Sequence, residues 1–217
     1  YNTPRAWFME RYFNPKTKKW DGPDADYRPE SDDIPWSMVP EKKITVEDVK
    51  YVLSSHFQGT PYDPYAAYGE KNMRGAYRSI GINRNDFLAV IQMRPGMECD
   101  CNVIEWIAFA SNAFNVLVPF YADIDETPDY LCNTTGEVST DNFYWSGRMI
   151  AAMADASYRS SVFHIERYFD YIRLINFAGL PAQISFAGMF FVTTDPAPIM
   201  AFSPIIRPGS IVAFAPI

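Results

Sequence analysis

The chain has 217 residues, of which 48% are hydrophobic, and its formal net charge is −7. This length and composition are enough to bury a sizeable core in one large or two small domains, so they exclude a disordered chain. The acidic balance, with 26 acidic against 19 basic residues, argues against a surface that binds the phosphates of nucleic acid.

The first predicted elements are a helix and a long loop. Residues 3–13 favour a short helix with Thr3 as N-cap and Pro4 at the first helical position. Residues 16–40 are rich in Pro, Asp and Lys and show no periodicity, which predicts a surface loop held by its tryptophans.

A second helix is predicted to begin after Thr45, because Glu47 and Asp48 place carboxylates in its first turn. Apolar residues follow at three- and four-residue spacing, and the same stripe continues to His56, which we expect to point inward. The helix leads into residues 54–65, where two prolines stiffen a connection crowded with polar side chains. That composition suits a binding loop better than a spacer.

Three strand-length apolar runs follow, at residues 87–93, 103–109 and 116–121. The first is apolar on both faces, which predicts a strand buried between two layers rather than one facing water. Pro119 places the third run at a sheet edge or a bulge.

Two helices are predicted after a turn-rich linker at residues 123–140. Asp141 and Asn142 are candidate caps for the first helix, and the second carries apolar residues at steps of three and four from Val162 to Ile172. Because these helices follow the strands in a block, the order predicts an α+β layered domain.

The cysteines and histidines do not form a recognisable catalytic or metal motif. Cys99, Cys101 and Cys132 are too few, and of odd number, for a disulfide framework, which favours a reducing, cytoplasmic compartment. One Cys-x-Cys lacks the paired two-residue spacing of zinc sites, so we expect no metal and no other cofactor. His56 and His164 stand beside no nucleophile motif.

Two other features are candidates for chemistry. The tryptophans and aspartates of residues 20–36 leave open a carbohydrate-acting site, although loop carboxylates more often cap the backbone or face water. Arg84 precedes the most apolar strand, where a cation needs a partner or a function. Pairing with Asp86 or extension into water is the structural alternative for Arg84.

Several motifs in a fixed order resemble one family, the cysteine-type dipeptidases of the N-terminal-nucleophile hydrolase superfamily, with its dipeptidase A and secernin relatives. The resemblance runs with little interruption to about residue 172. It is carried by the following segments: 1–7, 20–36, 54–65, 81–95, 115–121 and 139–145.

The resemblance implies a four-layer αββα sandwich, formed by two β-sheets covered by helices, and hydrolysis of the peptide bond of dipeptides. In that superfamily the nucleophile is the mature N-terminal residue, here expected to be a Cys upstream of Tyr1, so this chain alone is expected to be inactive. Arg84 resembles the arginine that related amidases place beside the nucleophile. The residues expected to line the substrate cleft are His56, Gln58, Tyr62 and Asp63.

We therefore expect residues 1–173 to be the C-terminal portion of the dipeptidase domain and residues 174–217 to be a tail that departs from the family pattern. Prolines divide this apolar tail into pieces shorter than the roughly 20 residues of a spanning helix, so no membrane anchor is expected. The expected partner is a dipeptide, with a homo-oligomer left open. The alternatives are a non-catalytic binding module of the same sandwich and the carbohydrate-acting protein.

Overall fold

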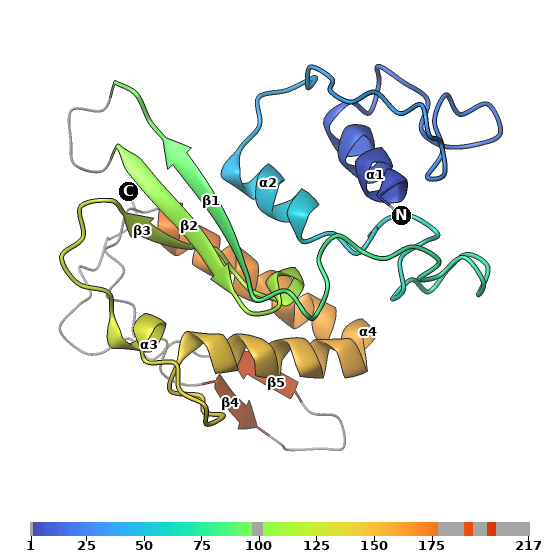
Figure 1. Ribbon diagram of the computed structural model, residues 1–217. Helices are drawn as coiled ribbons and strands as arrows, with labels where there is room; N and C mark the ends of the chain where they lie inside the picture. Colours follow the sequence, from blue (N-terminus) through green and yellow to red (C-terminus); the bar gives the residue numbers. More distant parts are fainter. Residues whose placement is uncertain (1, 97–101, 178–188, 193–198, 203–217) are drawn as a thin grey trace, which may run out of the picture.

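The computed structural model describes residues 2–96, 102–177, 189–192 and 199–202. These residues combine helices with a three-stranded and a two-stranded antiparallel sheet, so the predicted α+β class is confirmed (Figure 1). Cys99, Cys101 and most of the predicted tail at 174–217 lie outside the described residues.

The chain begins with helix α1 (Thr3–Phe13), which has a Pro in its first turn. Its N-cap is Asn2 rather than the predicted Thr3, because the Asn2 carbonyl already accepts the first hydrogen bonds of the helix. One face of α1 joins a core cluster that also contains residues from two loops. The buried members of this cluster are Trp7, Phe8, Trp20 and Phe57.

The segment 14–45 contains no helix or strand, as its composition predicted. Trp20 holds this loop, since it is 4% exposed and its indole N–H donates to the Asn14 carbonyl at 2.8 Å. Trp36 does not hold it, because its side chain is fully exposed. The prediction of a loop held by tryptophans is therefore correct for only one of the two.

Helix α2 (Val46–Leu53) begins with the predicted cap. The Thr45 hydroxyl accepts from the Asp48 N–H, and the Asp48 carboxylate accepts from the Thr45 N–H, which completes a capping box. The prediction that the helical stripe continues to His56 is wrong, because the helix ends at Leu53 and Phe57 adopts a left-handed φ of 65°. His56 is nevertheless buried.

The main sheet has the strand order β1-β2-β3, with both pairs antiparallel. Strands β1 (Phe87–Met93) and β2 (Val103–Phe109) have the predicted bounds, and β3 (Val118–Tyr121) begins two residues later than predicted. Pro119 lies on β3, an edge strand of this sheet, as expected for a residue without an N–H.

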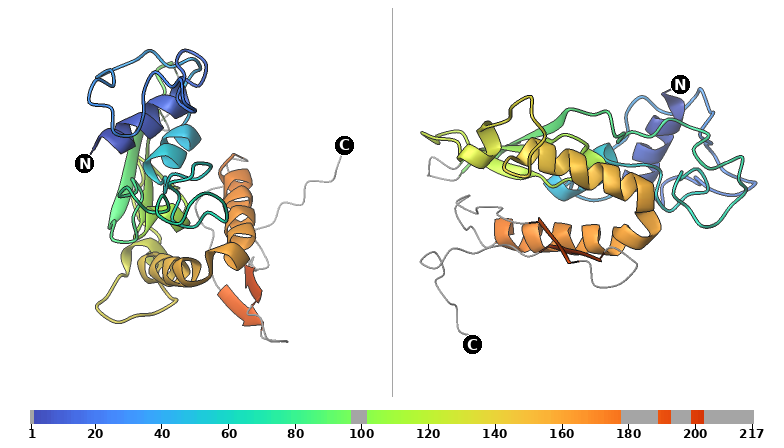
Figure 2. Two further views of the ribbon diagram at one scale, coloured as in Figure 1. Left: turned by 90° about the vertical axis from the view of Figure 1, so that its right-hand side faces the viewer. Right: turned by 90° about the horizontal axis from the view of Figure 1, so that it is seen from below.

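Strand β1 is not buried between two layers in the described part of the chain, so that prediction is wrong here. Its alternate residues Phe87, Ile91 and Met93 are 65, 67 and 75% exposed. Strand β1 is an edge strand of the sheet, and the helices lie on the opposite face of the sheet from these three side chains (Figure 2, left).

The long helix α4 (Phe143–Phe177) contains a kink at Ser157, whose φ of −140° and ψ of 34° are not helical. Its two halves correspond to the two predicted helices, and they run back alongside each other beyond the kink (Figure 2, right). The predicted cap is confirmed for Asn142, whose side-chain oxygen accepts from the Trp145 N–H at 2.9 Å. A buried cluster joins both halves: Phe114, Ile150, Ala151, Ala154 and Ile165.

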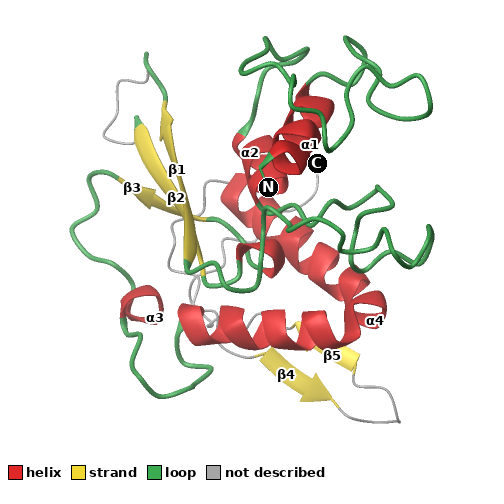
Figure 3. Ribbon diagram, turned by 45° about the vertical axis from the view of Figure 1, so that its right-hand side comes forward, coloured by secondary structure: helices red, strands yellow, loops and turns green. Residues whose placement is uncertain are grey.

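The remaining elements are short. They are the 3-10 turn η1 (Asn112–Phe114), helix α3 (Asp129–Cys132) and the hairpin of β4 (Met189–Val192) and β5 (Ile199–Phe202) (Figure 3). In the described ranges, no helix combines the length and the apolar character needed to cross a membrane.

Candidate functional site

Arg84 lies in an exposed turn that enters β1. The turn is closed by a hydrogen bond from the Asn85 N–H to the Ile82 carbonyl at 3.1 Å. Within the described part of the chain, no hydrogen bond or ion pair involves the Arg84 side chain, and Asp86 is paired with another residue. Pairing of Arg84 with Asp86 is therefore not observed, whereas the other structural alternative, extension of the side chain into water, agrees with the exposure of Arg84.

The residue that occupies Asp86 is Arg148, from the first half of α4. One of its terminal nitrogens lies 2.9 Å from the Asp86 carboxylate, and the other donates to the Asn83 carbonyl at 2.6 Å. The guanidinium also lies over the ring of Tyr144, 5.2 Å from its centroid. Arg148 thus binds the turn at Asn83 and at Asp86, which precede and follow Arg84 in the sequence.

A buried asparagine, Asn112, also holds this turn in place through hydrogen bonds. The Asn112 side chain is 1% exposed and its oxygen accepts from the Asn85 amide at 2.8 Å, while its nitrogen donates to the Leu53 carbonyl at 3.2 Å. Lys50 of α2 donates to the Asn112 carbonyl and to the Ser54 hydroxyl. The turn that carries Arg84 is therefore connected to α2 through buried polar groups.

Lys50 gives the folded chain a pH dependence that can be measured. Burial lowers the pKa of Lys50 to about 7, whereas an unfolded lysine titrates near about 10.4. Between these values the unfolded chain binds the extra proton, so the free energy of unfolding is expected to rise as the pH rises from about 7 to about 10. Urea unfolding of the Lys50→Met variant is expected to show a flatter rise.

The matched control for Lys50→Met is Lys42→Met, which removes an exposed ammonium that pairs with Asp48 at 2.7 Å. Lys42→Met should keep the rise between about pH 7 and about pH 10. If wild type and Lys50→Met rise in parallel over this range, the burial of the Lys50 ammonium is not what the structure indicates.

His56 and Asp63, both predicted to line a cleft, contact each other. The His56 Nδ1 atom lies 2.9 Å from an Asp63 carboxylate oxygen, and the two residues are 8 and 6% exposed. The His56 Nε2 atom lies 3.3 Å from the Tyr158 hydroxyl, just after the kink of α4. Both ring nitrogens are thus engaged within the protein.

Two tyrosines enclose His56. Tyr65 and Tyr158 stack with centroids 4.3 Å apart, and each meets the His56 ring edge to face. Burial raises the pKa of Tyr158 to about 12, and burial, with a hydrogen bond to Asp155, also raises the pKa of Tyr65. Both hydroxyls therefore remain protonated donors at neutral pH.

Gln58 and Tyr62, the other two predicted cleft residues, hold the loop in shape. The Gln58 side-chain oxygen accepts from the His56 N–H and from the Ser55 hydroxyl, both at 3.0 Å. Tyr62 packs against Tyr77 and edge-on against Trp7, in the core cluster of α1. No hydrogen bond or ion pair of the described residues joins Arg84 to these loop residues.

The loop and the Arg84 turn nevertheless meet through the backbone. The Ser55 carbonyl accepts from the N–H groups of Ile80 and Gly81, at 3.0 and 2.8 Å. The sequence analysis missed Lys50, Asn112 and Arg148, which do the positioning. The Lys50–Ser54 and Tyr144–Arg148 spacings of four residues were local signals; the partners that Lys50, Asn112 and Arg148 bind on other segments lie at least 27 residues away.

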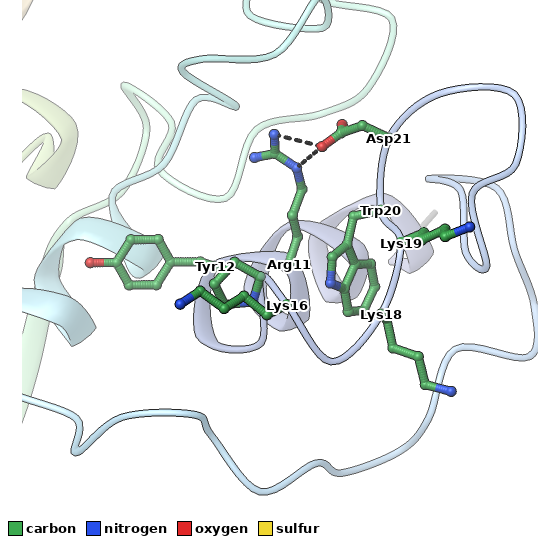
Figure 4. Close-up of a pocket in the computed structure, with 8 residues that line it drawn as sticks. Arg11, Tyr12, Lys16, Lys18, Lys19, Trp20 and Asp21 are labelled. Carbon is green, nitrogen blue, oxygen red and sulfur yellow. Dashed lines mark hydrogen bonds and ion pairs between the residues drawn. The ribbon is translucent and has the colours of Figure 1, made fainter.

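A pocket of about 500 Å³ lies elsewhere, at the C-terminal end of α1, and shares no residue with the Arg84 turn. It contains Arg11, which pairs with Asp21 at 2.9 Å, and its lysine side chains diverge (Figure 4). Trp20 is buried here, so its ring is unavailable to stack on a sugar, whereas Trp36 of the same loop is exposed; the carbohydrate-acting alternative stays untested. Within the described ranges no cluster of three His, Cys, Asp or Glu could hold a metal.

Comparison with known proteins places the chain among the peptidases: the model of peptidase family C69 matches residues 1–170. The chain is 55% identical over 168 residues to a dipeptidase of Bifidobacterium longum, covering 77% of this chain and 32% of the relative. It is 44% identical over 170 residues to a probable dipeptidase A of Streptococcus pyogenes serotype M18, covering 78 and 34%.

A dipeptidase A of Lactobacillus helveticus is 34% identical over 159 residues, covering 73 and 32%. The chain thus spans about a third of the length of the curated relatives it matches. It belongs to peptidase family C69, and the predicted relationship to the dipeptidase A proteins is confirmed.

Proposed function

We propose that this chain is the C-terminal portion of the catalytic domain of a cysteine-type dipeptidase. The observation that carries this proposal is the match of residues 1–170 to the model of peptidase family C69. The exposed Arg84 guanidinium, on a turn held by Arg148 and Asn112, is the candidate site residue. An exposed guanidinium on a turn fixed by hydrogen bonds can bind a ligand or transition state that carries negative charge. The relatives named as dipeptidases support the reaction class.

The proposed nucleophile is an N-terminal Cys that lies upstream of this chain. Its thiol sulfur attacks the peptide carbonyl carbon, and the thiol proton passes to the α-amino group of the same residue, whose pKa of about 8 suits a base at neutral pH. The C–N bond then breaks as the leaving amine takes up a proton, and water hydrolyses the thioester.

Arg84 is proposed to stabilise the charge that develops on the substrate oxygen in this reaction. His56, Gln58, Tyr62 and Asp63 are proposed to shape one wall of the dipeptide cleft rather than to react, because their polar atoms and rings already bind one another or the core.

We also propose that the intact domain is a four-layer sandwich, in which a second sheet covers the exposed face of β1. The support is that Phe87, Ile91 and Met93 are apolar yet more than half exposed. A strand that is apolar on both faces is typical of burial between two layers.

The test joins this chain to the upstream sequence of its coding region and measures dipeptide hydrolysis. Changing the N-terminal Cys to Ala is expected to abolish the release of amino acids. Arg84→Ala is expected to lower kcat about 100-fold, as removal of an oxyanion donor does. Arg167→Ala, which removes an exposed arginine from the second half of α4, is the control and should leave kcat unchanged.

Two results would count against these proposals, the first against the dipeptidase assignment and the second against the role of Arg84. The first is an upstream sequence without a Cys at the mature N-terminus, which would favour a binding module. The second is unchanged activity of Arg84→Ala, which would remove Arg84 from the reaction while leaving the dipeptidase assignment intact.

A further inference from the structure

Asp86 lies two residues after Arg84 and is the nearest carboxylate in the sequence, so it is the natural competitor for the Arg84 guanidinium. Its side chain is 80% exposed and could turn toward Arg84. In the structure it faces Arg148 instead, at 2.9 Å.

Partial burial and two hydrogen bonds give Arg148 the advantage in this competition. Its side chain is only 22% exposed, its Nε atom donates to the Tyr144 hydroxyl at 3.2 Å, and a terminal nitrogen donates to the Asn83 carbonyl. A planar guanidinium fixed in this way loses little further rotamer freedom when it binds a carboxylate. The Arg84 side chain, which is exposed, would lose more rotamer freedom on binding the same carboxylate.

We propose that Arg148 is a positioning residue that keeps Arg84 available to the substrate by holding Asp86 away from it. The role of Arg84 in this statement rests on the proposed function. The pairing of Asp86 is a property of this chain alone and can be measured without any activity.

The first experiment follows the Arg84 Nε–H signal by ¹⁵N NMR, assigned with Arg84→Lys, and measures its exchange with water. In Arg148→Gln, which keeps a donor for the Asn83 carbonyl but has no charge, Asp86 is released to Arg84. Exchange is expected to slow about two- to fivefold, the range of an exposed ion pair. In the double variant Arg148→Gln with Asp86→Asn, exchange should return to the wild-type rate.

The second experiment measures kcat/KM for alanyl-alanine in the protein joined to its upstream sequence. Arg148→Gln is expected to lower it about two- to fivefold, with recovery in the double variant. Asp86→Asn alone and Arg148→Lys, which can still bind Asp86, should resemble wild type. A merely structural role for Arg148 would give equal losses in Arg148→Gln and the double variant.

The outcomes separate the two proposals. Equal NMR exchange rates in all variants would overturn the role of Arg148, whatever the enzyme does. An NMR result as expected, with activity indifferent to Arg84 and Arg148 alike, would leave the positioning intact and overturn the proposed role of Arg84. If Arg148→Gln does not fold, Arg148→Met, which keeps the aliphatic stem but has no charge, supplies the comparison: Arg148→Met is then expected to show slower Arg84 exchange than its double variant with Asp86→Asn, and equal rates overturn the proposal.

Discussion

Replacing Gly81 with Ala is expected to destabilise the folded chain by about 3 kcal/mol or more, measured as the free energy of unfolding in urea. A Cβ atom at this position would lie 2.4 Å from the Ser54 carbonyl oxygen and 2.7 Å from the Ser54 Cα. These are backbone atoms, so no side chain can rotate away to make room. The Gly81 N–H also donates to the Ser55 carbonyl at 2.8 Å, so a retreat of the backbone would break this bond.

The control for Gly81→Ala is Gly136→Ala, since an added Cβ at Gly136 meets no atom within 4 Å. Its effect should stay within about 0.5 kcal/mol. Because the Arg84 turn begins directly after Gly81, the surviving folded fraction should also show faster amide exchange at residues 82–86. A loss below about 1 kcal/mol in Gly81→Ala would mean that the two segments approach each other less closely than described.

Replacing Asp63 with Ala is expected to cost the second largest amount, about 3 kcal/mol in the free energy of unfolding. One Asp63 oxygen lies 2.9 Å from His56 Nδ1 and accepts from the Tyr65 N–H at 2.8 Å. His56 is buried and the hydrogen bond of the Tyr65 N–H is partly buried, so the substitution removes the acceptor of two poorly hydrated polar groups. The variant loses stability because the His56 Nδ1 atom and the Tyr65 N–H give up hydration on folding and then have no acceptor or partner at position 63.

Asp63→Asn keeps an acceptor for the Tyr65 N–H and should recover part of this loss. Asp125→Ala, at an exposed carboxylate, provides the surface control and should change the stability by less than about 0.5 kcal/mol. Equal stabilities of Asp63→Ala and Asp125→Ala would show that the His56–Asp63 contact contributes nothing to the fold.

Local patterns predicted the elements well where a local cause determines them. The apolar runs of β1 and β2 gave the correct bounds, and Thr45 with Asp48 identified the start of α2. The end of α2 was misplaced because an apolar stripe does not mark where a helix stops: Ser54, with φ of −98° and ψ of 3°, already leaves the helix, three residues before the left-handed Phe57. The exposure of β1 was missed because an apolar face shows only that a strand could be buried there. It does not show whether this chain contains the residues that would cover that face.

The candidate site was predictable only in part. Arg84 stood out because a cation precedes an apolar strand, and the structure removes the competing pairing with Asp86. The supports of the turn were beyond local reasoning, since Arg148 reaches Asn83 across 65 residues and Lys50 reaches Asn112 across 62. Such pairs depend on tertiary packing and leave no periodic signal in the sequence.

The kink of α4 at Ser157 also sets the order in which the site can assemble during synthesis. The residues beside the kink supply the partners of His56 and Tyr65, which precede them by 102 and 90 residues. The loop 54–65 therefore cannot form these contacts until residue 158 has been synthesised. Contacts between residues about 100 positions apart in the sequence also form slowly. We expect the segment 54–65 to be open to proteases and chaperones in nascent chains that end before the kink, and protected in those that extend past it.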